Sequence, residues 1–186
     1  MSLKFLHLHL HGLIRSNSLE LGRDSDTGGQ TQYVLELVKS LANTSQVDQV
    51  DLVTRLIKDS KIDSSYSKEQ EFIAPGARIL RFQFGPNKYL RKELFWPYLD
   101  ELTQNLIQYY QKYENKPSFI HAHYADAGYV GVRLSQALKV PFIFTGHSLG
   151  REKKRKLLEA GLKINQIEKL YCITVSYTHL TLPTKA

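Results

Sequence analysis

Cysteine is nearly absent from this chain of 186 residues, in which Cys172 carries the only thiol. A single cysteine excludes an intramolecular disulfide and a multi-cysteine metal site, and it suits a reducing compartment. Long apolar runs are missing too, because three histidines interrupt the N-terminal stretch MSLKFLHLHLHGLI and no other stretch is long enough for a membrane span. We therefore expect a cytoplasmic protein with no membrane partner.

Well-known phosphate-binding and nucleic-acid-binding sequences are also missing. The chain contains neither the G-x-G-x-x-G fingerprint nor a P-loop, so we expect neither a dinucleotide site nor a Walker-type ATP site. It has no RNP-like aromatic strand, helix-turn-helix pattern or zinc pattern. The excess of basic residues is the only feature that favours nucleic-acid binding, and we expect no nucleic-acid partner.

Basic residues are in excess. The 25 Lys and Arg residues outnumber the 18 Asp and Glu residues, which gives a formal charge of +7. This excess favours an anionic ligand, for which nucleotide sugars and sugar phosphates both qualify. The length and the 42% of hydrophobic residues allow one well-buried domain.

Short β-rich runs alternate with amphipathic helical runs, which predicts an α/β fold with a Rossmann-like parallel sheet and helices on both faces. The expected strands cover residues 3–10, 50–57, 77–84, 118–123 and 140–145. The expected helices cover residues 28–42, 97–113, 125–139, 151–162 and 164–171, the first with Tyr33, Val34, Leu37, Val38 and Leu41 on its buried stripe.

Two stretches fall outside this alternation. The polar residues 58–77 are expected to form an exposed loop. Residues 175–186, VSYTHLTLPTKA, lack a helical period and resemble a translated synthetic sequencing adapter. The expected domain is therefore residues 1–174, which we expect to be truncated.

Two glycines open the first helix. Ligands of parallel sheets collect beyond the carboxyl ends of the strands, and a helix N-terminus there offers unpaired N–H groups to an anion. Gly28 and Gly29 carry no side chain that would keep a ligand away. In the alternative interpretation, Asp26 or Thr27 merely caps the helix and the glycines form a tight turn.

Two patterns suggest a metal, but each has a simpler explanation. Asp24-Ser25-Asp26 reads D-x-D, yet carboxylates just before a helix also cap or brace the loop, and this interpretation is favoured. His7, His9 and His11 alternate as metal ligands on a strand do, although hydrogen-bonded histidines fit the same spacing. We expect no metal site.

Histidines also close the later strands: His121 and His123 end one, and His147 ends the next. Neutral imidazole both donates and accepts hydrogen bonds, as sugar hydroxyls require. In the basic run that follows, we expect Arg151 and Lys153 to face the same edge of the sheet, because lysine near a helix start suits a phosphate.

Four motifs in order resemble the sucrose-phosphate synthase family of retaining glycosyltransferases with GT-B fold. They are HGLIRSNSLELGRDSDTGGQTQYVLELVKSLA, FGPNKYLRKELFWPYL, FIHAHYADAGYVGVRLSQAL and VPFIFTGHSLGREKKRKLL. The resemblance extends from about residue 5 to residue 174. It implies the N-terminal, acceptor-binding domain of an enzyme that transfers glucose from UDP-glucose to fructose 6-phosphate, with no cofactor and no essential metal.

The resemblance also implies roles for individual residues. His147 is the catalytic candidate, in contact with the glucosyl unit, and His123 is its neighbour. The remaining candidates bind substrate: Gly28, Gly29 and Gln30 at the donor diphosphate and the reacting sugars, and Lys92, Tyr124 and Lys153, with Arg151, at the acceptor phosphate.

The resemblance stops where the family continues with an arginine-bearing helix and a second, donor-binding domain. We therefore expect the chain by itself to have no detectable transferase activity. Four alternatives stay open: another GT-B enzyme such as sucrose synthase, whose acceptor is free fructose; a non-catalytic sugar-phosphate binding module; a basic nucleic-acid binder; and a metal-dependent D-x-D enzyme.

Overall fold

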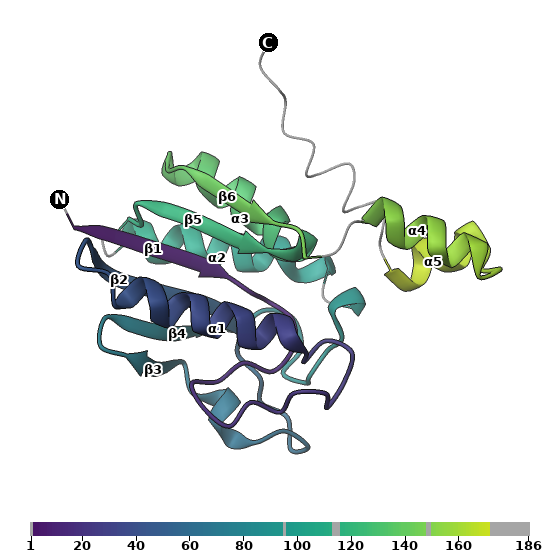
Figure 1. Ribbon diagram of the computed structural model, residues 1–186, viewed down its shortest axis with the longest axis horizontal. Helices are drawn as coiled ribbons and strands as arrows, with labels where there is room; N and C mark the ends of the chain where they lie inside the picture. Colours follow the sequence, from purple (N-terminus) through teal and green to yellow (C-terminus); the bar gives the residue numbers. More distant parts are fainter. Residues whose placement is uncertain (1, 95, 113–115, 148–149, 172–186) are drawn as a thin grey trace, which may run out of the picture.

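A six-stranded sheet forms the centre of the domain (Figure 1). The computed structural model describes residues 2–94, 96–112, 116–147 and 150–171. The strands are β1 (Leu3–Leu8), β2 (Val47–Arg55), β3 (Gln70–Ala74), β4 (Ala77–Phe82), β5 (Phe119–His123) and β6 (Phe142–Thr145). The α-helices are α1 (Gly29–Ala42), α2 (Leu99–Lys112), α3 (Tyr124–Leu138), α4 (Gly150–Glu159) and α5 (Ile164–Tyr171). Short 3-10 turns cover Ser64–Ser67, Lys92–Leu94 and Trp96–Tyr98.

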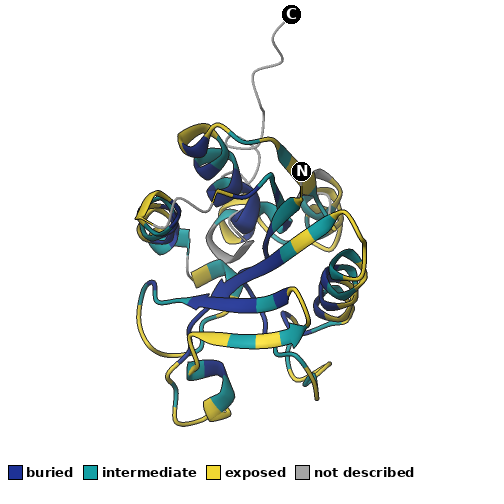
Figure 2. Cartoon of the chain, turned by 90° about the vertical axis from the view of Figure 1, so that its left-hand side faces the viewer, coloured by how far each residue is buried: buried dark blue, intermediate teal, exposed yellow. Residues whose placement is uncertain are grey.

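Helices cover both faces of the sheet, as predicted. Leu6 and Leu8 of β1 pack on one face with residues of α2 and α3 such as Leu106 and Leu134. Residues of β2 pack on the other face with α1, where Val34 is fully buried. Figure 2 shows the buried residues gathered in the central strands and on the inner sides of the helices. Successive side chains of β1 and β2 point to opposite faces of the sheet, so each strand contributes to two hydrophobic cores, one on each face.

The order of the strands is β3-β4-β2-β1-β5-β6, and all neighbours are parallel except β3 and β4. The chain passes from β1 to β2 and β4 on one side, and then returns to place β5 and β6 on the other side of β1. The point where the order reverses lies between β1 and β5. In open sheets of this kind, ligands bind beyond the carboxyl ends of the strands at such a point.

Two expectations need correction. Residues 58–77 are not all loop, because β3 lies within them and pairs antiparallel with β4 at the edge of the sheet. The buried side of α1 is formed by Thr31, Val34, Leu35 and Val38, and Tyr33 is instead 49% exposed. A spacing of three and four residues fits both the predicted stripe and the observed one, and packing of the helix on the sheet decides which of the two is buried.

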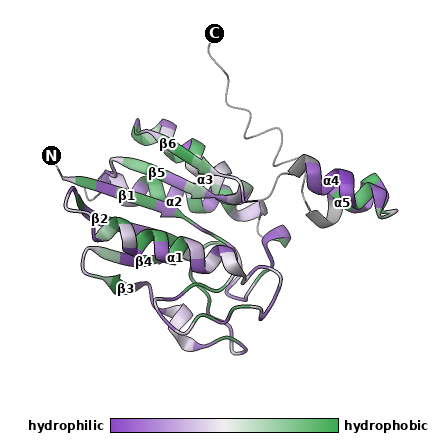
Figure 3. Ribbon diagram, in the orientation of Figure 1, coloured by the Kyte–Doolittle hydropathy of each residue, from purple (hydrophilic) through white to green (hydrophobic). Residues whose placement is uncertain are grey.

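Helix α4 differs from the other helices in composition. Figure 3 shows α4 as mostly hydrophilic, in contrast to the hydrophobic strands of the sheet. Lys154 of α4 forms an ion pair with Glu168 of α5, which links the two helices. Within the described ranges, no helix has the length and apolar character that crossing a membrane requires.

Candidate functional site

Three histidine side chains, linked in series by hydrogen bonds, join the carboxyl ends of β1, β5 and β6. Nδ1 of His7 lies 3.2 Å from Nε2 of His123, and Nδ1 of His123 lies 3.0 Å from Nε2 of His147. Burial lowers the pKa of His7 to about 3 and that of His123 to about 2, with neighbouring histidines adding to both shifts. The two rings are therefore neutral at pH 7, and each has one donor and one acceptor for these bonds.

The ring of His147 lies among aromatic side chains. It stacks on the ring of Tyr124 at 5.0 Å between centroids and meets Tyr33 of α1 edge-on at 5.3 Å. Both His147 and Tyr124 have left-handed backbone, with φ of 46° and 72°. This conformation costs a non-glycine residue about 1–3 kcal/mol, and such strain concentrates at functional sites. The exposed position of Tyr33, which the helical stripe did not predict, thus places its ring beside His147.

Asp24 braces the loop before α1. Its Oδ1 accepts hydrogen bonds from the backbone N–H groups of Asp26 at 2.9 Å and Thr27 at 2.8 Å. This agrees with the favoured interpretation of D-x-D as loop bracing.

The second acid of the pair, Asp26, is buried and holds Lys92. Its Oδ2 accepts from the backbone N–H of Lys92 at 2.9 Å, and its Oδ1 forms an ion pair with the ammonium group of the same residue. Burial alone would raise the pKa of Asp26, but the hydrogen bonds from Lys92 lower it overall. Lys92 is likewise held in its charged form, because Asp26 raises its pKa against the effect of burial.

The N-terminus of α1 has no side-chain cap. Gly28 occupies the capping position, Thr27 Oγ1 accepts from the backbone of Leu13, and Asp26 is engaged with Lys92. The alternative in which Asp26 or Thr27 caps the helix is therefore wrong. A Cβ atom added at Gly29 would meet no atom within 4 Å, so the space beside this first residue of the helix is open. The first N–H groups of a helix have no partner within the helix, and open space beside them suits an anion.

Gln30 supports this opening. Its Nε2 donates to the backbone oxygen of Asp26 at 2.7 Å, which ties the first turn of α1 to the loop. A Cβ atom added at Gly28 would lie 2.8 Å from Oε1 of Gln30, so the glycine makes room for this side chain.

A second lysine lies near Lys92. Lys153 of α4 is half-buried, and its pKa is lowered first by burial and then by the charge of Lys92. Tyr124 also interacts electrostatically with Lys92, and burial raises the pKa of its phenol, so its hydroxyl remains protonated. The structure therefore brings together Lys92, Tyr124 and Lys153. The side chain of Arg151 lies outside the described residues.

Sequence reasoning missed one pair at this edge. Nδ1 of His11 donates to Oδ2 of Asp126 at 2.8 Å, and both side chains are buried. Because an ionised carboxylate only accepts, the bond fixes the proton of His11 on Nδ1. The position of Asp126 in the first turn of α3 could have indicated this pair, because that turn begins at the same edge of the sheet.

These features define a ligand-binding domain of Rossmann type, with its site at the switch point of the sheet. The chain belongs to the family described as the first GT-B domain of sucrose synthase, whose model matches residues 3–184. The match agrees with the predicted fold class.

Curated relatives of this chain include sucrose-phosphate synthases. The chain is 42% identical over 192 residues to the probable sucrose-phosphate synthase 2 of Arabidopsis thaliana. The match covers 89% of this chain and 18% of the relative. It is 43% identical over 194 residues to the probable enzyme of Vicia faba and 40% identical over 194 residues to the enzyme of Spinacia oleracea, with the same coverage. The chain thus spans about a fifth of these relatives.

A solved structure has the same fold. The sucrose-phosphate synthase of Thermosynechococcus elongatus matches 94% of this chain and 39% of its own, with a TM-score of 0.70 and 24% identity. At this identity the match supports the arrangement of the elements rather than their chemistry.

We expect Asp24→Ala to lower the free energy of unfolding by about 1 kcal/mol, because two backbone N–H groups lose their acceptor. Asp24→Asn keeps a side-chain oxygen at the same place and is the matched control. Chemical denaturation of the three proteins measures the effect. A loss as large in Asp24→Asn as in Asp24→Ala would contradict the bracing role.

Proposed function

We propose that the chain is the acceptor-binding part of a retaining glycosyltransferase that transfers glucose from UDP-glucose to fructose 6-phosphate. The observation that carries the proposal is the convergence of Lys92 and Lys153 beside the uncapped N-terminus of α1, at the switch point of the sheet. The names of the relatives add support, because those proteins are sucrose-phosphate synthases.

The two lysines and Tyr124 would bind the acceptor phosphate. Lys92 is paired with Asp26, and the pKa of Lys153 is lowered first by burial and then by the charge of Lys92. A phosphate dianion would relieve this repulsion and accept a hydrogen bond from the protonated hydroxyl of Tyr124. Arg151 is assigned to the same group on the basis of its place in the sequence alone.

The donor would lie against Gly28, Gly29 and Gln30, with its diphosphate facing the first N–H groups of α1. His147 would contact the glucosyl unit, and its hydrogen bond to His123 fixes the orientation of the ring. A ring fixed in this way supports developing charge without having to reorganise during the reaction. In this proposal the transfer uses no cofactor and no essential metal.

The proposed reaction also needs groups from a donor-binding domain, since the chain spans only 18% of the first relatives. Carboxylates at the described edge already have partners: Asp24 holds the loop, Asp26 holds Lys92 and Asp126 holds His11. We therefore propose that the chain binds sugar phosphate by itself but transfers glucose only with its donor-binding domain.

Fructose 6-phosphate is expected to bind the chain more tightly than fructose, as measured by isothermal titration calorimetry. Lys153→Met should weaken binding of fructose 6-phosphate about 10- to 100-fold, because a charged hydrogen bond contributes about 1.5–3 kcal/mol. Lys156→Met, on an exposed position of the same helix, is the control and should bind as the wild type does. Equal affinity for the two sugars would instead favour an acceptor like that of sucrose synthase.

The lowered pKa of Lys153 predicts how this affinity depends on pH. Phosphate prefers the protonated ammonium group, so affinity should fall as the pH rises through the pKa of Lys153, below the pH at which an ordinary lysine loses its proton. Lys153→Arg should abolish the decline, because arginine stays charged. Titrations between about pH 7 and 10 test this, and the same decline in Lys153→Arg would assign it to another group.

A further inference from the structure

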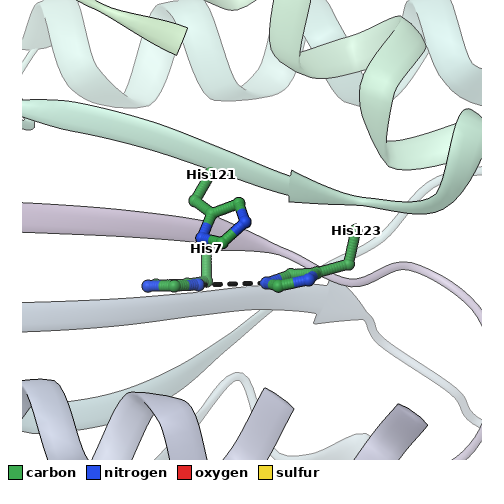
Figure 4. Close-up of side chains that lie close together, drawn as sticks. All are labelled: His7, His121 and His123. Carbon is green, nitrogen blue, oxygen red and sulfur yellow. Dashed lines mark hydrogen bonds between the residues drawn. The ribbon is translucent and has the colours of Figure 1, made fainter. Parts of the chain in front are cut away.

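Three histidines on one face of neighbouring strands lie outside the substrate contacts proposed above, apart from His123. His7 of β1 stands opposite His121 of β5 in the parallel register, and His123 follows two residues later on the same face. The ring centroid of His121 lies 5.0 Å from that of His7 and 4.2 Å from that of His123. Figure 4 shows the His121 ring beside the hydrogen bond that joins His7 and His123.

We propose that His7, His121 and His123 form a binding site for a divalent transition-metal ion of the zinc type. One ring nitrogen from each histidine lies within 4.8 Å of the others. The facing nitrogens of His7 and His123 are 3.2 Å apart, close to the separation of about 3.3 Å between two ligands of a tetrahedral ion with bonds of about 2.0–2.1 Å. Imidazole nitrogen is a preferred ligand of such ions, and three protein ligands leave a fourth position for water.

Outer partners already orient two of the rings. Nε2 of His121 lies 2.8 Å from Oγ1 of Thr145, so Nδ1 is the nitrogen that we assign to the ion. Nδ1 of His123 lies 3.0 Å from Nε2 of His147, which leaves Nε2 of His123 as ligand. Histidine ligands commonly hold their second nitrogen in this way, and such partners contribute to metal affinity.

Binding needs protons to move between the two nitrogens of neutral rings rather than to be lost. The hydrogen bond between His7 and His123 places a proton on one of the two facing nitrogens. When the ion takes the place of that proton, the proton moves to the other nitrogen of the same ring, and both facing nitrogens then present lone pairs. If that ring is His123, the proton on Nε2 of His147 moves to Nδ1 of His147 as well, so that the bond between the two rings is kept. The second nitrogen of His7 is buried and has no hydrogen-bond partner among the described residues, so the present arrangement leaves it unsatisfied.

The site shares His123 with the proposed transfer site, whereas His147 is not among its ligands. Occupancy would nevertheless place the proton of His123 on Nδ1, directed at Nε2 of His147. The ion would thereby fix the tautomer of His147 from the side of the sheet.

The test is a titration of the metal-free 186-residue chain with Co2+, followed by its visible absorption, and with Zn2+ in competition. We expect one ion per chain, with the spectrum of a tetrahedral site. His121→Gln should weaken binding at least about 100-fold, and Thr145→Val about 10- to 100-fold through its outer-shell role. His147→Ala should still bind the ion, which separates this site from the catalytic assignment.

Two controls remove other metal-binding groups, Cys172→Ser and His179→Gln, and both should bind as the wild type does. His121 is half-exposed, so His121→Gln is expected to fold even if a substitution of the fully buried His7 does not. Circular dichroism checks the fold of each variant. Absence of binding, unchanged binding in folded His121→Gln, or loss of binding in either control would overturn the proposal.

Discussion

Hydrogen bonds between imidazole rings at the ends of parallel strands are the interaction on which the site depends. The pairing of β1 with β5 and of β5 with β6 brings three strand ends to one edge, and His7, His123 and His147 are linked there in series. A neutral ring has one N–H group and one lone pair, so the direction of one bond determines the direction of the next. The orientation of His147 is therefore set by residues buried in the sheet.

Charged groups at the same edge surround these linked histidines. Three acids at this edge already have partners: Asp24 binds the loop backbone, Asp26 binds Lys92 and Asp126 binds His11. Lys153 adds positive charge near Lys92. The uncapped start of α1 adds the partial positive charge of a helix N-terminus. An anionic sugar derivative complements this distribution better than a neutral sugar does.

Much of the fold could be predicted from periodicity, because strand and helix spacings decide which residues face a core. The edge strand β3 could not, since all five of its residues are exposed or half-buried and its sequence, QEFIA, does not alternate between polar and apolar residues. At the site, the glycines and histidines could be placed at the carboxyl edge. The partners Asp26 and Lys92 are 66 residues apart, and His11 and Asp126 are 115 apart, so no local pattern reports either pair. Only the crossing of the chain at the switch point brings them together.

The most direct measurement is an NMR titration of the isotopically labelled chain with fructose 6-phosphate. The account predicts that amide shifts change at Gly28, Gly29, Tyr124 and Lys153, at the carboxyl edge, and not at Gln49 or Gly76 near the opposite end of the sheet. Shifts confined to the opposite end, or none at saturating ligand, would contradict the assignment of this edge as a sugar-phosphate site.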